Sequence, residues 1–297
     1  MSAAPILVLG GSGQVARSLM AQGDGTGLAL RGRPEFDFEA LDAIPALLAN
    51  IAPRMILNAA AYTAVDKAES EPDQADRANH LGPKLLAEYA AKAGIPLIHI
   101  STDYVFDGSK PAPYVETDPT GPTGVYGVSK LAGEQAVLAS GAHAIVLRTA
   151  WVYAAEGKNF VRTMLALGQK MPKLRVVADQ IGNPTCADDL AAAILAIARR
   201  IDAEGWRDEF GGIFHAAGTG AVTWHGFAQE IFRLAALCGR VAPEVEAIGT
   251  VDYPTPAKRP ANSQLDCSKL EAVFARRLPE WRESLARVVN EICATPR

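Results

Sequence analysis

The feature that most constrains the fold is a regular alternation of short apolar runs with longer amphipathic stretches through the first half of the chain. The apolar runs are "PILVLG", "GLALRGR", "RMILNAAA", "PLIHISTDYVF" and "AIVLRTAWVY". A continuous apolar run is typical of a parallel strand that is buried on both faces. The stretches between the runs have helical character, so the alternation predicts βαβ units and an α/β fold with a doubly wound parallel sheet.

A glycine-rich turn joins the first predicted strand to the first predicted helix. In "LVLGGSGQVARSL" the pattern is Gly10-x-x-Gly13-x-x-Ala16. Glycine permits a tight turn and a close approach of the backbone to a pyrophosphate, and the helix N-terminus supplies N–H groups and a partial positive charge. The same pattern also occurs in plain strand–helix turns, but its place at the first strand favours a dinucleotide site.

The chain divides near residue 150, where the regular alternation loosens. Residues 1–150 are predicted to form a dinucleotide-binding Rossmann domain, to which a later segment of about 175–220 returns. Residues 151–297 mix short strands with helices, and we expect them to form mainly a smaller C-terminal α/β domain that binds the substrate. Open parallel sheets bind ligands at the carboxyl ends of their strands, where this smaller domain would close over the sheet edge.

Composition and charge exclude several classes of protein. Of the 297 residues, 49% are hydrophobic and 21% are charged, and the formal net charge is −4. A nucleic-acid partner would require a basic surface, and a membrane protein would require a longer apolar run. The N-terminus lacks the basic region of a signal peptide, and the four cysteines match neither a zinc set nor a disulfide framework. We therefore expect a cytoplasmic protein without a nucleic-acid or membrane partner.

The stretch "GPTGVYGVSKLAGEQ" places a tyrosine and a lysine one helical turn apart. Of the chain's tyrosines, Tyr126 alone has a lysine four residues later, Lys130. Positions i and i+4 lie on the same helix face, which is also compatible with a chance surface contact. Beside a dinucleotide site the pair predicts a proton donor, because a nearby ammonium lowers the pKa of a phenol from about 10. Thr102, at the end of the neighbouring predicted strand, would supply a hydroxyl to a substrate carbonyl.

Arginines stand after the second predicted strand, where an acidic residue is usual in NADH-binding sheets. The segment "LALRGRPEF" contains Arg31 and Arg33, and Glu35 is its nearest acid. A carboxylate there binds the ribose 2′-hydroxyl of NADH, whereas an arginine accommodates the 2′-phosphate of NADPH. The two arginines are equally compatible with solvated surface charges. We take Arg31 as a candidate contact for NADPH and expect that NADH is also accepted.

Seven motifs give the chain a resemblance to the extended short-chain dehydrogenase/reductase family. They are "GGSGQVA", "NAAAYTAVDKAESEP", "STDYVFDG", "YGVSKLAGE", "LRTAWVY", "DQIGNPT" and "TPAKRPANSQLD". The first is common to many relatives, whereas "AYTAVDKAE" together with "STDYVFDG" and "RPANS" is more specific. More narrowly, the set is similar to the reductases that complete dTDP-L-rhamnose synthesis. The resemblance implies NAD(P)H-dependent reduction of the C4 ketone of dTDP-4-dehydro-6-deoxy-L-mannose, a nucleotide sugar also called dTDP-4-dehydro-β-L-rhamnose.

The resemblance also implies roles for individual residues. The implied catalytic set is Thr102, Tyr126 and Lys130. Besides Tyr126 and Lys130, the implied cofactor contacts are Gly10, Gly13, Gln14, Val15, Asp37, Phe38, Ala60, Ala61 and Tyr62. Besides Thr102 and Tyr126, the implied substrate contacts are Val65, Asp103, Trp151, Arg259, Asn262 and Ser263.

Several of these residues also have a purely structural interpretation. Trp151 lies at the end of a predicted strand and is compatible with ordinary core. Arg259, Asn262 and Ser263 either brace a proline-rich loop or hold the nucleotide diphosphate, since arginine suits phosphate oxygens. Asn79 is either a buried polar group of a long helix or the anchor of a proton-relay water.

One position departs from the pattern of some relatives, which carry a glutamate on the first helix that binds Mg²⁺ at a dimer interface. This chain has Ser18 at that point. The substitution makes a bound Mg²⁺, and a dimer built around it, doubtful. No metal ligand is assigned, and both a monomer and a homodimer stay open.

Two other functions are compatible with the sequence. One is another nucleotide-sugar epimerase, reductase or dehydratase of the extended family, although a dehydratase would need a glutamate where Tyr104 follows Asp103. An epimerase would retain its cofactor through purification. The other is a non-catalytic regulatory subunit that binds dinucleotide, against which the intact Thr102, Tyr126 and Lys130 count.

Overall fold

The computed structural model describes residues 4–23 and 25–294. The centre of the described chain is a six-stranded sheet in the order β10-β5-β4-β3-β1-β2, and every neighbouring pair is parallel. Its strands are β1 (Ile6–Leu9), β2 (Leu28–Arg31), β3 (Met55–Asn58), β4 (Leu97–Thr102), β5 (Ala144–Thr149) and β10 (Gly212–His215). The predicted doubly wound parallel sheet is thus confirmed. The strand order reverses between β1 and β3, and such a switch point opens a crevice for a ligand.

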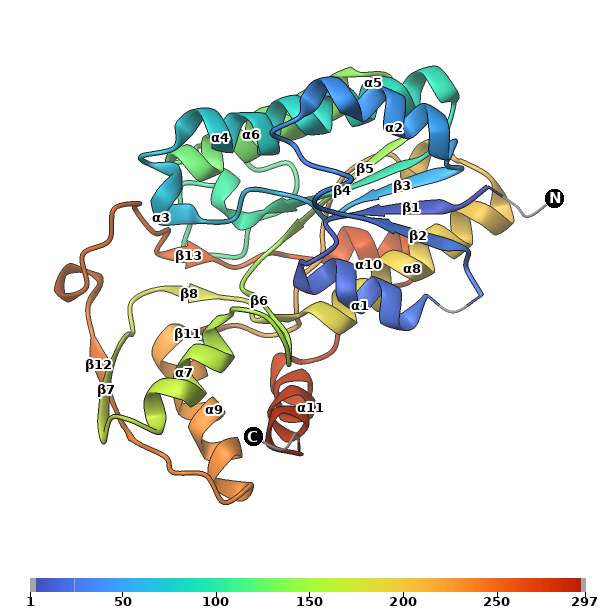
Figure 1. Ribbon diagram of the computed structural model, residues 1–297. Coiled ribbons are helices and arrows are strands. Elements are labelled where there is room, and N and C mark those ends of the chain that lie inside the picture. The colour runs from blue at the N-terminus through green and yellow to red at the C-terminus, as the bar shows by residue number, and fades with distance from the viewer. Residues whose placement is uncertain (1–3, 24, 295–297) are drawn as a thin grey trace.

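Helices cover both faces of this sheet (Figure 1). On one face lie α1 (Gln14–Gln22), α8 (Ala187–Glu204) and α10 (Ser268–Phe274). On the other lie α2 (Ile44–Ile51), α5 (Gly82–Ala93) and α6 (Val125–Ala139). Successive strand residues point to opposite faces, so Val8 packs with Ile194 of α8 while Leu7 packs with Leu86 of α5. Both faces are therefore apolar, which explains the uninterrupted apolar runs.

A second group of elements lies below the carboxyl edge of the sheet in Figure 1. Helices α7 (Phe160–Gly168), α9 (Trp224–Leu237) and α11 (Trp281–Ala294) share their own apolar core. Short strands flank them: β7 (Lys173–Val177) with β12 (Glu244–Ile248), β6 (Val152–Tyr153) with β9 (Thr185–Cys186), and β8 (Ile181–Gly182) between β11 (Val222–Thr223) and β13 (Asn262–Ser263). Between these elements the chain returns to the sheet through α8 and β10. Within the described ranges, no helix combines the length and the apolar character that crossing a membrane requires.

Two predicted strands are shorter than the sequence indicates. The run ending in "STDYVF" leaves the sheet after Thr102, where a turn of 3₁₀ helix, Asp103–Val105, begins. The run "AIVLRTAWVY" is broken at Trp151, whose φ of 47° is in the left-handed region. A non-glycine residue rarely adopts that conformation, and it turns the chain out of the sheet before β6 begins. Both breaks occur at the carboxyl edge, where the apolar character continues but the sheet does not.

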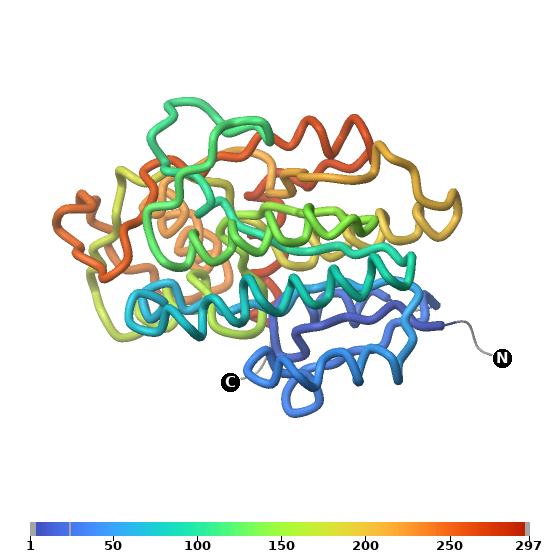
Figure 2. The backbone as a smooth tube through the Cα atoms, turned by 90° about the horizontal axis from the view of Figure 1, so that it is seen from above, coloured from blue at the N-terminus to red at the C-terminus, as the bar shows by residue number. Residues whose placement is uncertain are grey.

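The long helix predicted over residues 72–94 contains an interruption. It starts as α4 (Pro72–Asp76), passes through a π-helical turn over Arg77–Leu81, and continues as α5 until Gly94, whose φ is 65°. Seen from above, the long helix lies alongside α6 (Figure 2). The π turn brings the Asn79 carbonyl so close to α6 that a Cβ at Gly133 would lie 1.9 Å from the Asn79 oxygen.

The side chain of Asn79 makes hydrogen bonds to the loop after β3 and to α6. Its amide accepts from the Tyr62 N–H at 2.9 Å and donates to the Tyr62 carbonyl at 3.1 Å and to Ser129 Oγ at 3.1 Å. Asn79 is fully buried, so these bonds satisfy a polar group that would otherwise be costly to bury. The side chain therefore ties the loop after β3 to α6, and a proton-relay water anchored by Asn79 stays a prediction.

A buried ion pair fixes α6 to the sheet. Arg148 of β5 donates from Nε to Glu134 Oε1 at 3.0 Å and from Nη2 to Glu134 Oε2 at 2.7 Å. The two side chains are 2% and 1% exposed, and the guanidinium also lies 4.9 Å from the centroid of the Phe106 ring. A bidentate pair fixes both distance and orientation. It therefore sets the position of the helix that carries Tyr126 and Lys130.

The ion pair gives the first prediction. We expect Glu134→Gln to lower the free energy of unfolding by about 3–5 kcal/mol, because it leaves a buried guanidinium without its counter-charge. The measurement is equilibrium unfolding in urea. The matched control is Glu88→Gln, which breaks the exposed Lys84–Glu88 pair of α5 and should leave stability nearly unchanged. Equal effects from the two variants would contradict this role of Glu134.

Candidate active site

The glycine turn after β1 forms a cradle that fits a dinucleotide phosphate. Gly10 has a φ of 113°, and a Cβ there would lie 2.9 Å from the backbone of Ala59 on β3's continuation. Gly13 donates to the Gly10 carbonyl at 2.7 Å and is the N-cap of α1, with no side chain capping the helix. The first N–H groups of α1 therefore stay available to an anion.

One half of the site is a cleft of about 500 Å³ on the β1–β3 side of the glycine turn. Of the predicted cofactor contacts, its lining contains Gly10, Gly13, Asp37, Phe38, Ala60, Ala61 and Tyr62. The rings of Phe36 and Phe38 meet edge to face at 4.9 Å and form an apolar wall. The shape, with an apolar wall beside a phosphate cradle, suits the adenosine half of a dinucleotide.

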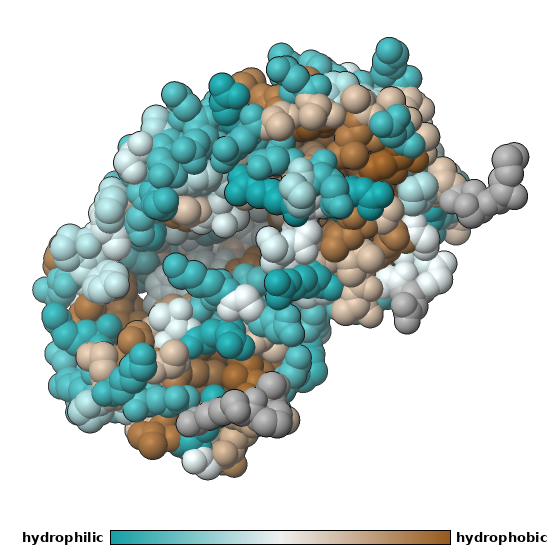
Figure 3. All heavy atoms as spheres, viewed as in Figure 1, coloured by the Kyte–Doolittle hydropathy of each residue, from teal (hydrophilic) through white to brown (hydrophobic). Residues whose placement is uncertain are grey.

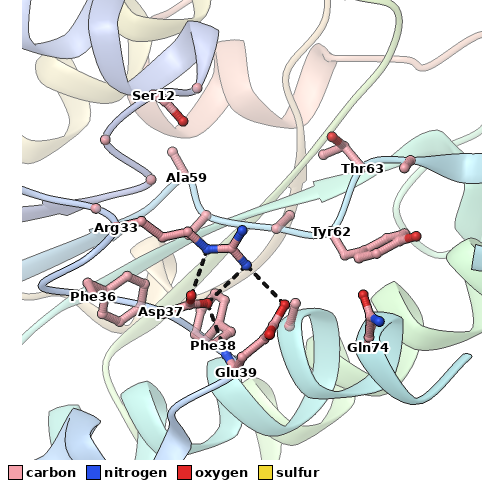
Figure 4. A pocket seen from close by; sticks show the side chains of 18 of the residues that line it. Ser12, Arg33, Phe36, Asp37, Phe38, Glu39, Ala59, Tyr62, Thr63 and Gln74 are labelled. Atoms are coloured by element: carbon pink, nitrogen blue, oxygen red, sulfur yellow. Dashed lines mark hydrogen bonds and ion pairs between the residues drawn. The ribbon is translucent and has the colours of Figure 1, made fainter. Parts of the chain in front are cut away.

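Arg33, rather than Arg31, reaches this cleft. Arg33 lines it and pairs with Asp37 at 2.7 Å and with Glu39 at 3.2 Å, as the dashed lines in Figure 4 show. Arg31 is absent from the lining, and its Nη1 donates to the Leu30 carbonyl at 2.7 Å. The role of Arg31 in binding NADPH thus stays a prediction without support from this geometry. The arginine that lines this cleft is Arg33, and two carboxylates already hold it.

The other half of the site is an adjoining cleft of about 470 Å³ that shares Ser12, Gly13, Ala59, Ala61 and Thr63 with the first. The surface is hollowed between the sheet and the C-terminal helices (Figure 3). The second cleft brings together the predicted residues Gln14, Val15, Val65, Thr102, Asp103, Tyr126, Lys130 and Trp151. The predicted catalytic set and the phosphate cradle therefore line one continuous depression.

Tyr126 and Lys130 lie on the buried face of α6. Burial raises the pKa of Tyr126 to about 12, and a hydrogen bond with Thr102 partly offsets this rise. Burial also lowers the pKa of Lys130 to about 8, with Glu134 acting in the opposite direction. Burial is thus the largest effect on this phenol, and the lowering of its pKa by the neighbouring ammonium stays a prediction.

The Lys130 ammonium is held by β4 and not by Tyr126. Its Nζ donates to the Ile100 carbonyl at 2.7 Å and lies 3.5 Å from His99 Nε2. His99 is fully buried and accepts at Nδ1 from the Asn58 amide at 2.9 Å, while Asn58 Oδ1 accepts from the Ala60 N–H. Burial, followed by Lys130, lowers the pKa of His99, which keeps the imidazole neutral. The network fixes the Lys130 ammonium one helical turn from the Tyr126 phenol. The ammonium has three N–H donors, so it can also donate to a ligand.

Thr102 and Asp103 form a second buried pair at the end of β4. Thr102 Oγ1 donates to Asp103 Oδ1 at 3.0 Å and accepts from the Tyr104 N–H at 3.3 Å. Burial raises the pKa of Asp103 to about 6, against the effect of hydrogen bonds from Ser263 and Thr102. Asp103 Oδ2 is buried without a hydrogen-bond partner. An acceptor of this kind is ready for a ligand hydroxyl.

Trp151 lines the second cleft, and its indole packs against Trp224 and Gly182. Its ring stacks on Trp224 with centroids 3.4 Å apart and an interplanar angle of 8°. A Cβ at Gly182 would lie 2.6 Å from Cε2 of the same indole. The left-handed backbone of Trp151 and this close support show a side chain held in one orientation by its surroundings. Trp224 carries no sequence signal that distinguishes it from a core tryptophan.

Three predicted substrate residues lie outside both clefts. Arg259 donates to Asp66 Oδ2 at 2.8 Å, and one of its nitrogens, Nη1, is buried without a partner. The Asn262 amide donates to the carbonyls of Lys110 and Ala112 and accepts from a backbone N–H, so it braces a loop. Ser263 is buried and lies close enough to Asp103 to lower the pKa of that carboxyl. Diphosphate binding by these residues stays a prediction.

In the part of the chain that the structure describes, acidic and imidazole groups do not gather in the manner of a metal site. Among residues 4–23 and 25–294, no cluster of three or more His, Cys, Asp or Glu side chains is placed to hold an ion. Ser18, at the position where some relatives have a glutamate, is buried on α1.

Comparison with known proteins shows one family for this chain. The family model "RmlD substrate binding domain" matches residues 4–294. The chain is 48% identical over 286 residues to a dTDP-4-dehydrorhamnose reductase of Sinorhizobium fredii, and the match covers 96% of both chains.

Two solved dTDP-4-dehydrorhamnose reductase structures superpose on this chain with a TM-score of 0.88. The one from Clostridium acetobutylicum is 37% identical, with 96% of this chain and 98% of that chain covered. The one from Bacillus anthracis, in complex with NADP, is 32% identical, with 97% and 99% covered. The chain therefore belongs to the dTDP-4-dehydrorhamnose reductase family.

Proposed function

We propose that the protein reduces the C4 ketone of dTDP-4-dehydro-6-deoxy-L-mannose with NADPH and releases dTDP-L-rhamnose. The observation that carries the proposal is the single cleft in which Thr102, Tyr126 and Lys130 stand beside the phosphate cradle of α1. The names of the relatives give the reductase activity, and one of their structures contains NADP. The residues of the cleft fit both the cofactor and a ketone substrate.

The protein's part in the reaction is to hold and deliver a proton. Bound NADPH would supply a hydride to the sugar C4. With a pKa of about 12, Tyr126 is protonated at neutral pH and donates its proton to the oxygen on C4 as negative charge develops there. Thr102 Oγ1 donates to Asp103 in the protein without ligands, so its hydroxyl must turn from Asp103 to donate to the sugar carbonyl. Lys130, held at the Ile100 carbonyl, has further N–H groups for the nicotinamide ribose.

The two parts of the chain would divide the work of binding. We assign dinucleotide binding to residues 1–150 together with α8 and β10. Strand β10 completes the sheet, and α8 packs beside α1 on one of its faces. The remaining part of residues 151–297 would mainly hold the sugar nucleotide, because Trp151 and its support Trp224 belong to it. This division keeps the hydride donor on the rigid sheet and the variable substrate contacts on the smaller part.

The proton-donor assignment has a direct test. We expect the wild type to oxidise NADPH at 340 nm only when the 4-keto-6-deoxy-L-sugar nucleotide is present. Tyr126→Phe removes the proton and keeps the ring, so kcat should fall by at least about 10²-fold while NADPH still binds. Lys130→Met should in addition weaken NADPH binding. Near-normal turnover by Tyr126→Phe would exclude Tyr126 as the donor, and nicotinamide retained by the purified wild type would instead favour an epimerase.

The substrate wall has its own test. Trp151→Ala should raise the KM of the sugar nucleotide about tenfold, equivalent to ~1.4 kcal/mol, through loss of an aromatic contact. The KM of NADPH should not change. Gly182→Ala keeps the indole but displaces it, because a Cβ would come within 2.6 Å of its ring, and should raise the same KM. Two results together would place the indole in the core instead. One is an insoluble Trp151→Ala protein, and the other is a ligand-bound wild-type structure in which Trp151 does not contact the sugar.

Cofactor choice depends on Arg33. We propose that NADPH is preferred over NADH by about tenfold in kcat/KM, which corresponds to ~1.4 kcal/mol. The preference is modest because a 2′-phosphate must compete with Asp37 and Glu39 for the exposed guanidinium. Arg33→Ala should remove the preference, and Arg31→Ala, which alters a side chain outside the cleft, is the matched control. A preference that survives in Arg33→Ala but is lost in Arg31→Ala would reverse the assignment.

A further inference from the structure

The charges that line the two clefts are nearly balanced before any ligand binds. Among the described residues, the lining contains the cations Arg33, Lys67, Lys130 and Lys158 and the acids Asp37, Glu39, Glu71 and Asp103. The proposed reaction brings two diphosphates, one on the dinucleotide and one on the sugar nucleotide. Backbone N–H groups of the glycine turn supply partial charge but no full cation. Neutralising these diphosphates would therefore require a cation that is not already paired with an acid of the cleft.

Most of these cations already have partners. Arg33 pairs with Asp37 and Glu39. Lys67 pairs with Glu71 at 3.2 Å, and Lys130 is buried and donates to a backbone carbonyl.

Lys158 differs from the other three. It is exposed at the rim of the second cleft, and in the described part of the chain it makes neither a hydrogen bond nor an ion pair. Its charge is thus the uncommitted one in the lining.

The loop that carries Lys158 is fastened to the N-terminus of α1. Asn159 donates to Gln14 Oε1 at 2.8 Å and to the Ala154 carbonyl at 2.9 Å, and it also caps α7. Glu156 pairs with Arg17 of α1 at 2.9 Å. These contacts place the loop over the first turn of the helix that begins the phosphate cradle.

Gly157, the residue before the lysine, allows the loop to approach α1 closely. Gly157 has a φ of 78°, and a Cβ there would lie 3.3 Å from Cγ of Gln14, the first residue of α1. Lys158 lines the cleft together with Gly13, Gln14 and Val15 of the same helix start. The lysine therefore lines the same cleft as the phosphate cradle, on a loop that lies against the start of α1.

We propose that Lys158 is the cation that neutralises the diphosphate of the bound dinucleotide, from a loop fastened to α1 by Asn159 and Glu156. The assignment rests on the dinucleotide use proposed above. It adds a contact from the C-terminal part of the chain to a cofactor otherwise held by the sheet. Because the lysine is exposed, its contribution is moderate and falls with added salt.

The test is a direct titration of NADPH, without sugar nucleotide, into the wild type and Lys158→Ala. We expect the Kd to rise about fivefold at low ionic strength in Lys158→Ala, the upper range for an exposed charge pair, and to converge with the wild type at about 0.5 M salt. Lys158→Arg keeps the charge and should stay near the wild-type Kd. Lys92→Ala, on the outer part of α5, makes the same change in net charge and should have no effect.

Three outcomes would contradict the proposal in different ways. An unchanged NADPH Kd in Lys158→Ala would overturn it. An unchanged Kd with a raised KM for the sugar nucleotide would overturn it as well and assign the lysine to the other diphosphate. A wild type that binds neither NADPH nor NADH would overturn the proposed function itself and the role of Lys158 with it.

Discussion

The buried pair of Glu134 with Arg148 is the interaction on which the geometry of the site depends. Tyr126, Lys130 and Glu134 follow one another at intervals of four residues on α6, so they share one helix face. Anchoring the third of them to β5 sets the rotation and depth of the other two against β4, where Thr102 and the Ile100 carbonyl lie. The same carboxylate also favours the charged form of Lys130. One ion pair therefore sets the position of α6 and also favours the charged form of Lys130.

The loop after β3 is positioned by two buried amides from opposite sides. Asn58 bonds to the Ala60 N–H and to His99 within the sheet, and Asn79 bonds to the backbone of Tyr62 from the helix layer. This loop lines both clefts, through Ala61 and Thr63. Fixing it through satisfied polar groups in the core gives the ligand cleft a rigid floor, which preorganises binding.

Sequence patterns predicted the sheet, its helices and the grouping of Thr102, Tyr126 and Lys130, because apolar period, glycine turns and i,i+4 spacing are local properties. They did not predict contacts that depend on long-range placement. The pairing of Arg33 with Asp37 and Glu39 and the stacking of Trp224 on Trp151 involve side chains with no distinguishing local pattern. The effect of burial on the phenol pKa could not be predicted for the same reason, since burial depends on the whole fold.

The π-helical turn at Arg77–Leu81 has a consequence for how this chain tolerates insertions and deletions. A π turn contains one residue more than the α-helical turn it replaces. Deleting one residue there would therefore give a regular α-helix whose two ends still present the same faces. The deletion would instead remove the wide turn from which the Asn79 side chain reaches the Tyr62 backbone and the Asn79 carbonyl approaches Gly133. The π turn thus lets this segment carry one additional residue without rotating α5, and the effect of losing that residue would fall on the loop after β3 rather than on the helix.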